Sequence, residues 1–375
     1  MTKIALTLIV KNEAHVITRC LDSAKAIADY VYVSDTGSTD GTQEIIRHWL
    51  YINNIPGMVT ENKWVNFAVN RSNVTKDMKV VAPDIDYCFM IDADEIMNIK
   101  EGVDIDEFKN SLTADAYHVT AVYEPLRYTR IYLFSNKKPF IYKSVVHEFV
   151  DCNELHNLGT VDPDSIFITT RQDGAASIDC TNKWKGHIAL MSAALKTEKD
   201  PLLISRYHFY LAESYKRDGN INKAIKHYNI RTKLGFWDQE RYIAYVYMAR
   251  LKEIAKEPLT NIMKDYLAAI ELAPTRLEVY RDIVKLLTLH CKYQQAYIYG
   301  KHALSLITNY PPNGLFVDLD VWSWSLIDEF SVCAYYAGYI DEAKELYLKL
   351  LEVDSALPSA HRNRIITNLS FCNNI

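Results

Sequence analysis

The sequence contains few of the residues that build flexible or cross-linked chains. Glycine and proline number only 12 and 11 among 375 residues, which argues against long disordered linkers. The seven cysteines lie far apart in the chain, none forms a C-x-x-C pair, and their number is odd. This pattern excludes a disulfide framework and a zinc-finger spacing, and it favours a reducing compartment.

The sequence also lacks a block of like charge. The formal net charge is -5, and 24% of the residues are charged. Proteins that bind nucleic acid usually carry a strongly basic patch, so we expect no nucleic-acid partner.

The abundance of Tyr, Ile, Lys and Asn is typical of an AT-rich bacterial or viral genome. We therefore predict a cytoplasmic location in a bacterial cell or an infected host, and we leave peripheral contact with a membrane open.

No apolar run is long enough to cross a membrane. The N-terminal run Ile4–Val10 ends at Lys11, and no small-residue cleavage site follows it. We therefore expect neither a transmembrane segment nor a signal peptide. This run instead has the composition of a buried first strand.

The hydrophobic period changes near residue 178. Before this point, strand-like runs at Ile4–Val10, Tyr30–Val33 and Tyr87–Ile91 alternate with amphipathic stretches, a pattern typical of a largely parallel sheet. Further strand-like runs follow without convincing helices between them: Ala116–Tyr123, Ile131–Phe134, Val145–Val150 and Ile166–Thr169. Residues 1–178 are therefore predicted to be an α/β domain with a parallel core and an antiparallel extension.

Residues 179–375 are predicted to be almost entirely helical. Three stretches share a turn position that is followed five residues later by an alanine, where two helices approach closely: Gly219 with Ala224, Cys291 with Ala296, and Gly338 with Ala343. These features are typical of degenerate tetratricopeptide-like repeats. Such a domain offers a surface for a protein partner, an acceptor or a second copy of the chain, and the sequence leaves these alternatives open.

Three acids, Asp92, Asp94 and Glu95, follow the apolar run YCFMI. The carboxyl ends of strands in open α/β sheets border the crevice where ligands bind. Converging negative charges are costly unless a positive partner lies among them. A solvated acidic turn is the alternative interpretation, and this stretch alone does not exclude it.

The second predicted strand leads into SDTGSTDGT, residues 34–42. This stretch is neither a dinucleotide-binding fingerprint nor a P-loop. Asp35 is suited to accept a hydrogen bond from a base imide or a ribose hydroxyl. Gly37 and Ser38 would let the backbone approach a ligand, and Asp40 is predicted to cap the following helix.

The order of several motifs is more specific than any one of them. LIVKNEAHVITRCLDS, VSDTGSTDGT, KWVNFAVNRS, FMIDADE and SVVHEF follow one another along the chain. In this order they resemble the inverting glycosyltransferases of family 2, and more narrowly the subgroup with a tetratricopeptide-like helical domain behind the catalytic domain. RQDGAASIDCTNKW, residues 171–184, resembles the junction of that subgroup. The resemblance implies an α/β GT-A nucleotide-diphospho-sugar transferase fold followed by an all-α repeat domain.

The resemblance also implies roles for single residues. Glu13 would lie near the nucleotide, Asp35 would contact the base or ribose, and Arg71 would lie near the donor phosphates. Asp94 and His147 would be metal ligands, with Asp92 beside the ribose and the metal-bound diphosphate. The expected donor crevice comprises Val10, Asn12, Glu13, Asp35, Gly37, Ser38, Arg71, Asp92 and Ala93.

The implied cofactor is Mn²⁺ or Mg²⁺. A nucleoside diphosphate needs its charge offset before the sugar–phosphate bond breaks, and a hard cation held by few protein carboxylates can do this. A histidine ligand favours Mn²⁺, because imidazole is softer than carboxylate. The implied activity moves a hexosyl or N-acetylhexosaminyl unit from a nucleotide sugar, by expectation a UDP-sugar, to a hydroxyl of a glycan, protein or lipid.

Inversion requires a general base that deprotonates the acceptor hydroxyl. Glu148 and Glu124 are the two candidates, and the sequence does not choose between them. Two positions depart from the family pattern: Ser144 stands where a glycine commonly precedes V-H-E, and Ser72 follows Arg71 in place of asparagine. These departures leave the identity of the sugar open.

Two other classes of protein fit part of this pattern. A haloacid-dehalogenase-like phosphatase also has D-x-D after a strand, but its nucleophilic Asp belongs to an early strand, and Tyr87–Ile91 is not the first strand here. A helical-repeat interaction protein with an inactive GT-A half is the other alternative. The presence of Asp35, Asp92, Asp94 and His147 together speaks against it.

Overall fold

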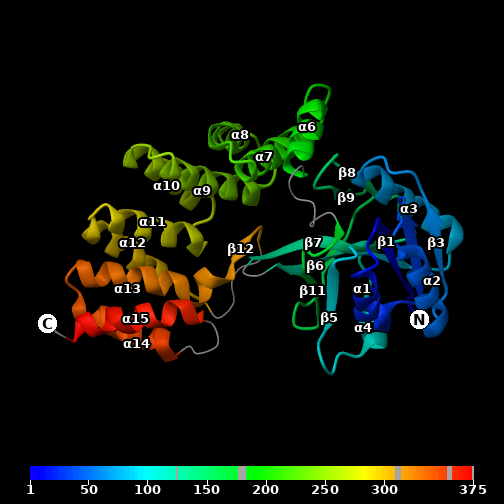
Figure 1. Cartoon of the computed structure of the whole chain (residues 1–375), viewed down its shortest axis with the longest axis horizontal. Helices are drawn as coiled ribbons and strands as arrows, with labels where there is room; N and C mark the ends of the chain where they lie inside the picture. Colours follow the sequence, from blue (N-terminus) through cyan, green and yellow to red (C-terminus); the bar gives the residue numbers. More distant parts are fainter. Residues whose placement is uncertain (124–125, 176–182, 309–313, 353–356, 374–375) are drawn as a thin grey trace. The chain divides into compact units, whose positions relative to one another are not determined.

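The protein is represented by a computed structural model, which describes residues 1–123, 126–175, 183–308, 314–352 and 357–373 (Figure 1). The chain divides into two compact units. The first holds Met1–Tyr123 and Tyr128–Gly219, and the second holds Asn220–Ile375 together with Glu124–Arg127. The predicted boundary at residue 178 falls among residues outside the described ranges, so that boundary stays a prediction.

A mixed sheet forms the centre of the first unit. Four neighbouring strands run parallel to one another, in the order β3 (Gly57–Glu61), β2 (Tyr30–Asp35), β1 (Ile4–Val10) and β4 (Tyr87–Met90). The sheet then continues through β7 (Leu126–Ser135), β6 (Ala116–Tyr123), β11 (Ile166–Thr170) and β5 (Glu95–Ile99). The β4–β7 and β11–β5 pairs are antiparallel. A parallel core with an antiparallel extension is the arrangement that the sequence predicted.

Three short strands complete the β structure of this unit. Strand β10 (Leu158–Thr160) pairs with β6, while β8 (Ile141–Lys143) and β9 (Phe149–Asp151) form a separate antiparallel pair. The strand predicted at Val145–Val150 is therefore wrong before Phe149, because Ser144, just before the range, and His147, within it, have positive φ angles of 81° and 55°. Left-handed backbone at two positions cannot continue an extended strand.

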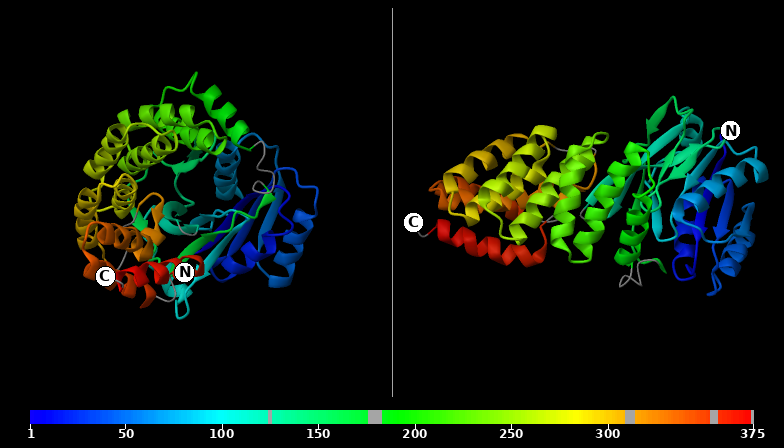
Figure 2. Two further views of the ribbon diagram at one scale, coloured as in Figure 1. Left: turned by 60° about the vertical axis from the view of Figure 1, so that its left-hand side comes forward. Right: turned by 90° about the horizontal axis from the view of Figure 1, so that it is seen from above.

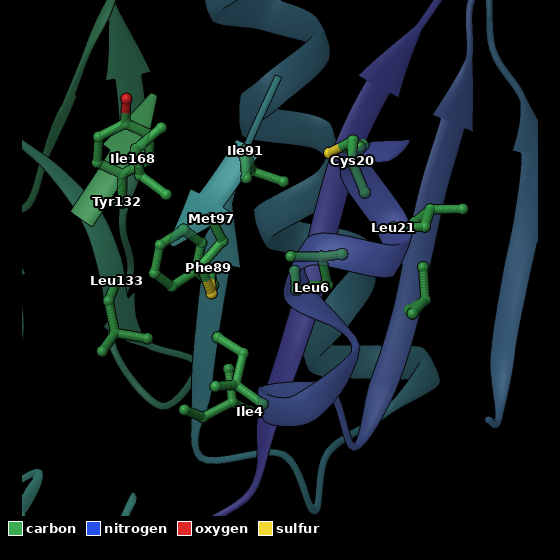
Figure 3. Close-up of a cluster of buried hydrophobic side chains, with 14 of the residues drawn as sticks. Ile4, Leu6, Cys20, Leu21, Phe89, Ile91, Met97, Tyr132, Leu133 and Ile168 are labelled. Carbon is green, nitrogen blue, oxygen red and sulfur yellow. The ribbon is translucent and has the colours of Figure 1, made fainter. Parts of the chain in front are cut away.

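Helices cover both faces of the parallel strands. Alternate residues of β1 serve the two faces, as the period of two requires. Leu6 and Leu8 belong to one hydrophobic cluster with residues of α1 (Ile17–Ala24) and α2 (Thr42–Asn53), whereas Ala5 belongs to another with residues of α3 (Phe67–Val81). The first cluster draws on β1, β4, β5, β7, β11 and α1 (Figure 3).

Helices α4 (Ile105–Ser111), α6 (Lys183–Ala194) and α7 (Pro201–Arg217) also belong to the first unit. Helices α6 and α7 pack together around Val146, with Met191, Tyr207 and Leu211 in the same cluster. The residues just before β9 are thereby fixed between the small β8–β9 sheet and this helical pair.

The second unit is built from paired helices, which follow one another in a stack (Figures 1 and 2). Its helices are α8 (Ile221–Lys233), α9 (Asp238–Ile254), α10 (Leu259–Leu272), α11 (Leu277–Leu289), α12 (Tyr293–Ser305), α13 (Leu326–Tyr336), α14 (Ile340–Glu352) and α15 (Ser359–Cys372). A π-helical turn, Val321–Ser325, precedes α13, and a short strand, β12 (Val317–Asp318), pairs with the start of β7. The fold class predicted from the sequence, α/β followed by all-α, is confirmed.

The predicted turn positions have the expected backbone. Gly219, Cys291 and Gly338 all have positive φ angles, 79°, 56° and 91°. The alanines five residues after them, Ala224, Ala296 and Ala343, are all fully buried. Cys291 thus adopts the conformation that glycine adopts in the other two turns. Among the described residues, no helix combines the length and apolar character that crossing a bilayer would require.

Candidate active site

The parallel pairing brings three polar loops to one edge of the sheet. Val10 lies opposite Asp35 in the β1–β2 pair, and Thr7 lies opposite Met90 in the β1–β4 pair. The carboxyl ends of β2, β1 and β4 are therefore neighbours, in that order. Asp35, the loop around Glu13 and the IDADE segment all emerge at this edge, which is where open α/β sheets bind ligands.

Hydrogen bonds lace the loops after β1 and β2 together. The N–H of Asn12 donates to Ser38 Oγ at 2.8 Å, and the N–H of Thr39 donates to Asn12 Oδ1 at 2.8 Å. The N–H of Glu13 donates to Thr42 Oγ1 at 2.9 Å. Asn12 has a positive φ of 58°, a conformation that asparagine tolerates better than most residues. These contacts fix the predicted residues Asn12, Glu13 and Ser38 relative to each other.

Asp35 is fully buried, and only one of its carboxylate oxygens is occupied. Its Oδ1 accepts from the N–H groups of Gly37 and Ser38, each at 2.8 Å. Its Oδ2 is buried without a hydrogen-bond partner in the part of the chain that the structure describes. Gly37 permits this turn through its φ of 109°. A buried acceptor without a donor is costly, so Oδ2 marks a place where a ligand N–H or O–H would be stabilising.

Asp40, Val10 and Ala93 have structural roles at the predicted crevice. Gly41, rather than Asp40, is the residue that precedes the first turn of α2, but Asp40 Oδ1 accepts from the N–H of Thr42 at 3.1 Å. Val10 and Ala93 are both buried in the core. They can therefore contribute backbone and shape to a ligand site, but little side-chain contact.

Asp92 lies between two guanidinium groups. Arg71 Nη2 pairs with Asp92 Oδ1, and Arg130 Nη2 lies 3.2 Å from Asp92 Oδ2. Burial raises the pKa of Asp92, but the positive charges of Arg71 and Arg130 outweigh this effect and hold its pKa at about 2. Asp92, the first acid of the D-x-D motif, is therefore an anion at neutral pH. Arg71 and Arg130 are the positive partners that the sequence analysis expected beside the clustered acids.

Arg71 also binds the candidate base. Its Nε lies 2.7 Å from Glu148 Oε1, and its side chain is only 3% exposed. The sequence placed Arg71 near the donor phosphates. The structure places its charge between Asp92 and Glu148, so a phosphate contact stays a prediction from the resemblance. The other candidate base, Glu124, lies outside the described residues.

Glu95 is buried beneath this network. Its Oε1 accepts from Tyr132 Oη at 2.7 Å, and its Oε2 accepts from Arg130 Nη2 at 3.2 Å and from the N–H of Asp92 at 3.0 Å. Burial raises the pKa of Glu95 to about 7, with the charge of Asp92 acting in the same direction and Arg130 against it. Glu95 thus supports the D-x-D loop from below.

Asp94 and Glu13 form the outer part of the acidic edge. Both side chains are half-buried. Burial raises the pKa of Asp94, and Asp92 raises it further. Burial likewise raises the pKa of Glu13, with a further contribution from Asp94. Each carboxylate therefore disfavours ionisation of the other, a mutual repulsion that a cation between them would relieve.

His147 lies in a different set of contacts. Its ring stacks on Tyr210 with centroids 4.0 Å apart and meets His187 edge-on at 5.5 Å. Its Nε2 is buried without a hydrogen-bond partner among the described residues. Burial lowers the pKa of His147 to about 3, and His187 lowers it further. The imidazole is therefore neutral, the form that binds metals, while its ring neighbours come from α6 and α7.

The backbone explains how neighbouring His147 and Glu148 reach different groups. Both residues precede β9, which begins at Phe149, so the alternation of a strand does not govern them. Ser144, where the family commonly has glycine, has a φ of 81°, and its Oγ donates to the carbonyl of Val146 at 2.6 Å. The position therefore needs a left-handed conformation, which glycine adopts at low cost.

Sequence reasoning missed four residues of this region. Arg130 and Tyr132, on β7, hold Asp92 and Glu95, and Arg19 and Asp173 form an ion pair at 2.6 Å beside Glu13 and Asp94. The available signal was a charged residue, Arg130, directly before the strand-like run Ile131–Phe134. Over the described ranges, no three His, Cys, Asp or Glu side chains are grouped closely enough to form a complete metal site.

Residues 6–101 match the family described as glycosyl transferase family 2. No curated protein matches the sequence. Similar solved structures include S. aureus TarS 1-349 in complex with UDP-GlcNAc, which is 12% identical, with 90% of this chain and 92% of that chain covered and a TM-score of 0.35.

Two other similar structures are helical-repeat proteins. MamA is 16% identical, with 48% of this chain and 94% of that chain covered and a TM-score of 0.38. The thermophilic TPR protein TTC0263 of Thermus thermophilus is also 16% identical, with 53% of this chain and 94% of that chain covered and a TM-score of 0.31.

Proposed function

Because residues 6–101 match glycosyl transferase family 2, we propose that the protein transfers a sugar from a nucleotide sugar to an acceptor hydroxyl with inversion. The proposed donor is a UDP-sugar, and the proposed unit is a hexose or an N-acetylhexosamine. The observation that carries this proposal is that Asp35, Asp92 and Asp94 lie at the same edge of the sheet. Asp35 ends β2, Asp92 and Asp94 follow β4, and these two strands flank β1.

The nucleoside is proposed to bind beside Asp35. The free Oδ2 of this buried carboxylate would accept from a base imide or a ribose hydroxyl. A site that offers a fixed, buried acceptor rejects ligands that lack the matching donor, because the acceptor would then stay unpaired. Gly37 and Ser38, whose N–H groups hold Oδ1, fix the direction of Oδ2.

A divalent cation, Mn²⁺ or Mg²⁺, is proposed as the cofactor. Asp94 and His147 would hold it, and Glu13 lies close enough to Asp94 for the two carboxylates to repel each other. Carboxylate and neutral imidazole are both suitable ligands for Mn²⁺. When bound, such a cation offsets the charge that develops on the leaving diphosphate. Asp92, already paired with two arginines, is better suited to a ribose hydroxyl.

Glu148 is proposed as the general base, and Glu124 stays the alternative. Arg71 holds Glu148 Oε1 at 2.7 Å, which fixes the carboxylate in one place. A base must lie within hydrogen-bond reach of the hydroxyl that it deprotonates, so a fixed position is a prerequisite. The proton of the acceptor hydroxyl would pass to the carboxylate as the hydroxyl oxygen attacks the anomeric carbon.

The acceptor is proposed to be a hydroxyl of a glycan, a protein or a lipid, and the helical unit is proposed to bind either this acceptor or a protein partner. Paired helices of this kind present extended surfaces for ligands. Self-association of the chain through the same unit is a further alternative.

A screen of nucleotide sugars for release of free nucleoside diphosphate tests the proposal. The protein is incubated with UDP-, GDP- and TDP-sugars in Mn²⁺, Mg²⁺ or EDTA. We expect release from a UDP-sugar in Mn²⁺ and none in EDTA. Asp84→Ala is the matched control, because Asp84 is an exposed acid before β4, at the opposite end of the strand from Asp92. No release from any donor would instead favour an inactive interaction protein.

A further inference from the structure

The chain leaves the sheet through Arg171–Ala175, here called the exit segment, and this segment lies against the outer acids. The N–H of Arg171 donates to the carbonyl of Asp94 at 3.2 Å. The N–H of Ala175 donates to the Glu13 carboxylate, at 3.3 Å to Oε1 and 3.1 Å to Oε2. The exit segment therefore contacts Glu13 and Asp94, which are carried by two different loops.

Gly174 brings the backbone close to both carboxylates. A Cβ at this position would lie 3.2 Å from Asp94 Cγ and 3.2 Å from Glu13 Oε2. The Gly174 backbone also hydrogen-bonds to Asp94, which lowers the pKa of Asp94 against the larger effect of burial. Any side chain at residue 174 would push against the two acids, so the close approach depends on glycine.

Asp173 attaches the exit segment to helix α1. Arg19 donates from Nη1 to Asp173 Oδ2 at 2.8 Å and from Nη2 to Asp173 Oδ1 at 2.6 Å. His15 Nε2 lies 2.7 Å from the carbonyl of Asp173. The two parallel bonds between Arg19 and Asp173 form a bidentate pair, the most directional kind of ion pair in proteins. Asp173 thus fixes the segment immediately before Gly174 and Ala175.

We propose that Arg19 and Asp173 are positioning residues that hold the exit segment across Glu13 and Asp94, so that these carboxylates stay oriented for the cation and the donor diphosphate. This inference rests on the proposed function. A carboxylate offers about four acceptor positions, so an N–H donor and a cation can share it. Hydrogen bonds to carboxylate ligands orient them, and their loss typically weakens metal binding by about 10–100-fold.

The charges around the pair support a positioning role. Asp94 repels Glu13, and the exit segment offers a backbone hydrogen bond to each of them, from Ala175 to Glu13 and from Gly174 to Asp94. These backbone groups carry no net charge that would compete with a cation. The Arg19–Asp173 pair is itself 35% and 43% exposed, so it contributes little to overall stability. Its loss should therefore change the site more than the fold.

Charge exchange between Arg19 and Asp173 tests the inference. Arg19→Asp and Asp173→Arg are prepared singly and together. Asp173→Asn is a milder variant, for use if a charge-exchange variant has a much lower melting temperature than the wild type. Mn²⁺ affinity in the presence of UDP is measured from the electron paramagnetic resonance signal of free Mn²⁺, alongside thermal melting. Each single variant should bind Mn²⁺ roughly tenfold more weakly or worse, and the double variant should recover most of this loss. Asp84→Arg, in the exposed pair with Lys3, is the matched control.

The outcomes separate the inference from the function on which it rests. If the wild type binds no Mn²⁺ with UDP, both are overturned. If the wild type binds but the single variants bind within about twofold of it, only the positioning role is overturned. Tighter binding by Asp173→Asn would also overturn it, because the exit segment would then obstruct the acids. Weaker single variants that the double variant rescues would support it.

Discussion

Arg71 Nε donates to Glu148 Oε1 across 2.7 Å, while the same guanidinium pairs with Asp92. One buried side chain thus joins the acid that follows β4 to the acid that precedes β9. These are the first acid of the D-x-D motif and the proposed general base. Arg71 therefore links the part of the proposed site that follows β4 to the part that precedes β9.

Arg71→Ala should destabilise the protein strongly. Removing one partner of a buried ion pair leaves uncompensated charge and costs about 3–5 kcal/mol, and we expect the lower end because Asp92 is 32% exposed. Urea unfolding of wild type and variant in EDTA measures this change. Arg47→Ala, which removes an exposed arginine paired with Glu44, is the control and should cost under about 1 kcal/mol. Unchanged stability with a much higher donor KM would instead assign Arg71 to the phosphates.

Glu95→Gln should remove a pH-dependent loss of stability. The folded-state pKa of Glu95 is raised to about 7, above its ordinary 4.5. The contribution of Glu95 to the free energy of unfolding is therefore fully present below about pH 4.5 and is lost as the pH rises through 7. The wild type should therefore lose about 2–3 kcal/mol more than the variant between pH 5 and pH 8. Parallel stability profiles of the two proteins in EDTA would contradict the assignment of this group.

Cys291→Gly should stabilise the helical unit. Cys291 is exposed and has a φ of 56°, a backbone conformation that costs a residue with a Cβ about 1–2 kcal/mol. Glycine avoids this cost but loses more entropy on folding, so the expected net gain is about 0.5–1 kcal/mol. Gly338→Ala is the reverse control, because an added Cβ there meets open space and reports backbone strain alone. A loss of stability in Cys291→Gly would argue that the thiol has a packing role.

His147→Phe separates a metal ligand from a packing residue. Phenylalanine keeps a ring to stack on Tyr210 but lacks the unpartnered Nε2. We expect weaker Mn²⁺ binding with UDP and little change in melting temperature. The effect should be smaller than that of Asp94→Ala, because water can take a vacated coordination position. Unchanged Mn²⁺ binding would mean that His147 serves only the contacts with Tyr210 and His187.

The sequence predicted the elements whose signals are local. β1, β2 and β4 are mostly apolar, and the hairpin turns at Gly219 and Gly338 are marked by glycine. Their carboxyl-end acids could be placed at one edge because parallel strands end together. Cys291 shows the same principle in weaker form, since the following alanine marked the turn although glycine was absent.

What the sequence could not provide depends on long-range contacts. Strand β5 begins at the acidic residue Glu95. The local sequence there is typical of a turn, and only the pairing with β11 makes it a strand. Arg130 is 38 residues from Asp92, and no local pattern indicates that they meet. The strand-like run Val145–Val150 predicted one strand, but the left-handed residues Ser144 and His147 delay the strand to Phe149, and serine in place of glycine concealed that turn.

The most direct test of the account is nucleoside diphosphate release by wild type and Asp94→Ala, with melting temperatures measured on the same samples. Asp94 is half-buried and repelled by Asp92, so its removal should leave the melting temperature unchanged or slightly higher. Release should fall about 10²–10³-fold, since electrostatic stabilisation of the leaving group is worth roughly 3–4 kcal/mol per group. Asp84→Ala should release diphosphate like the wild type. Near-normal release by Asp94→Ala, or a loss explained by unfolding, would contradict the proposed donor site.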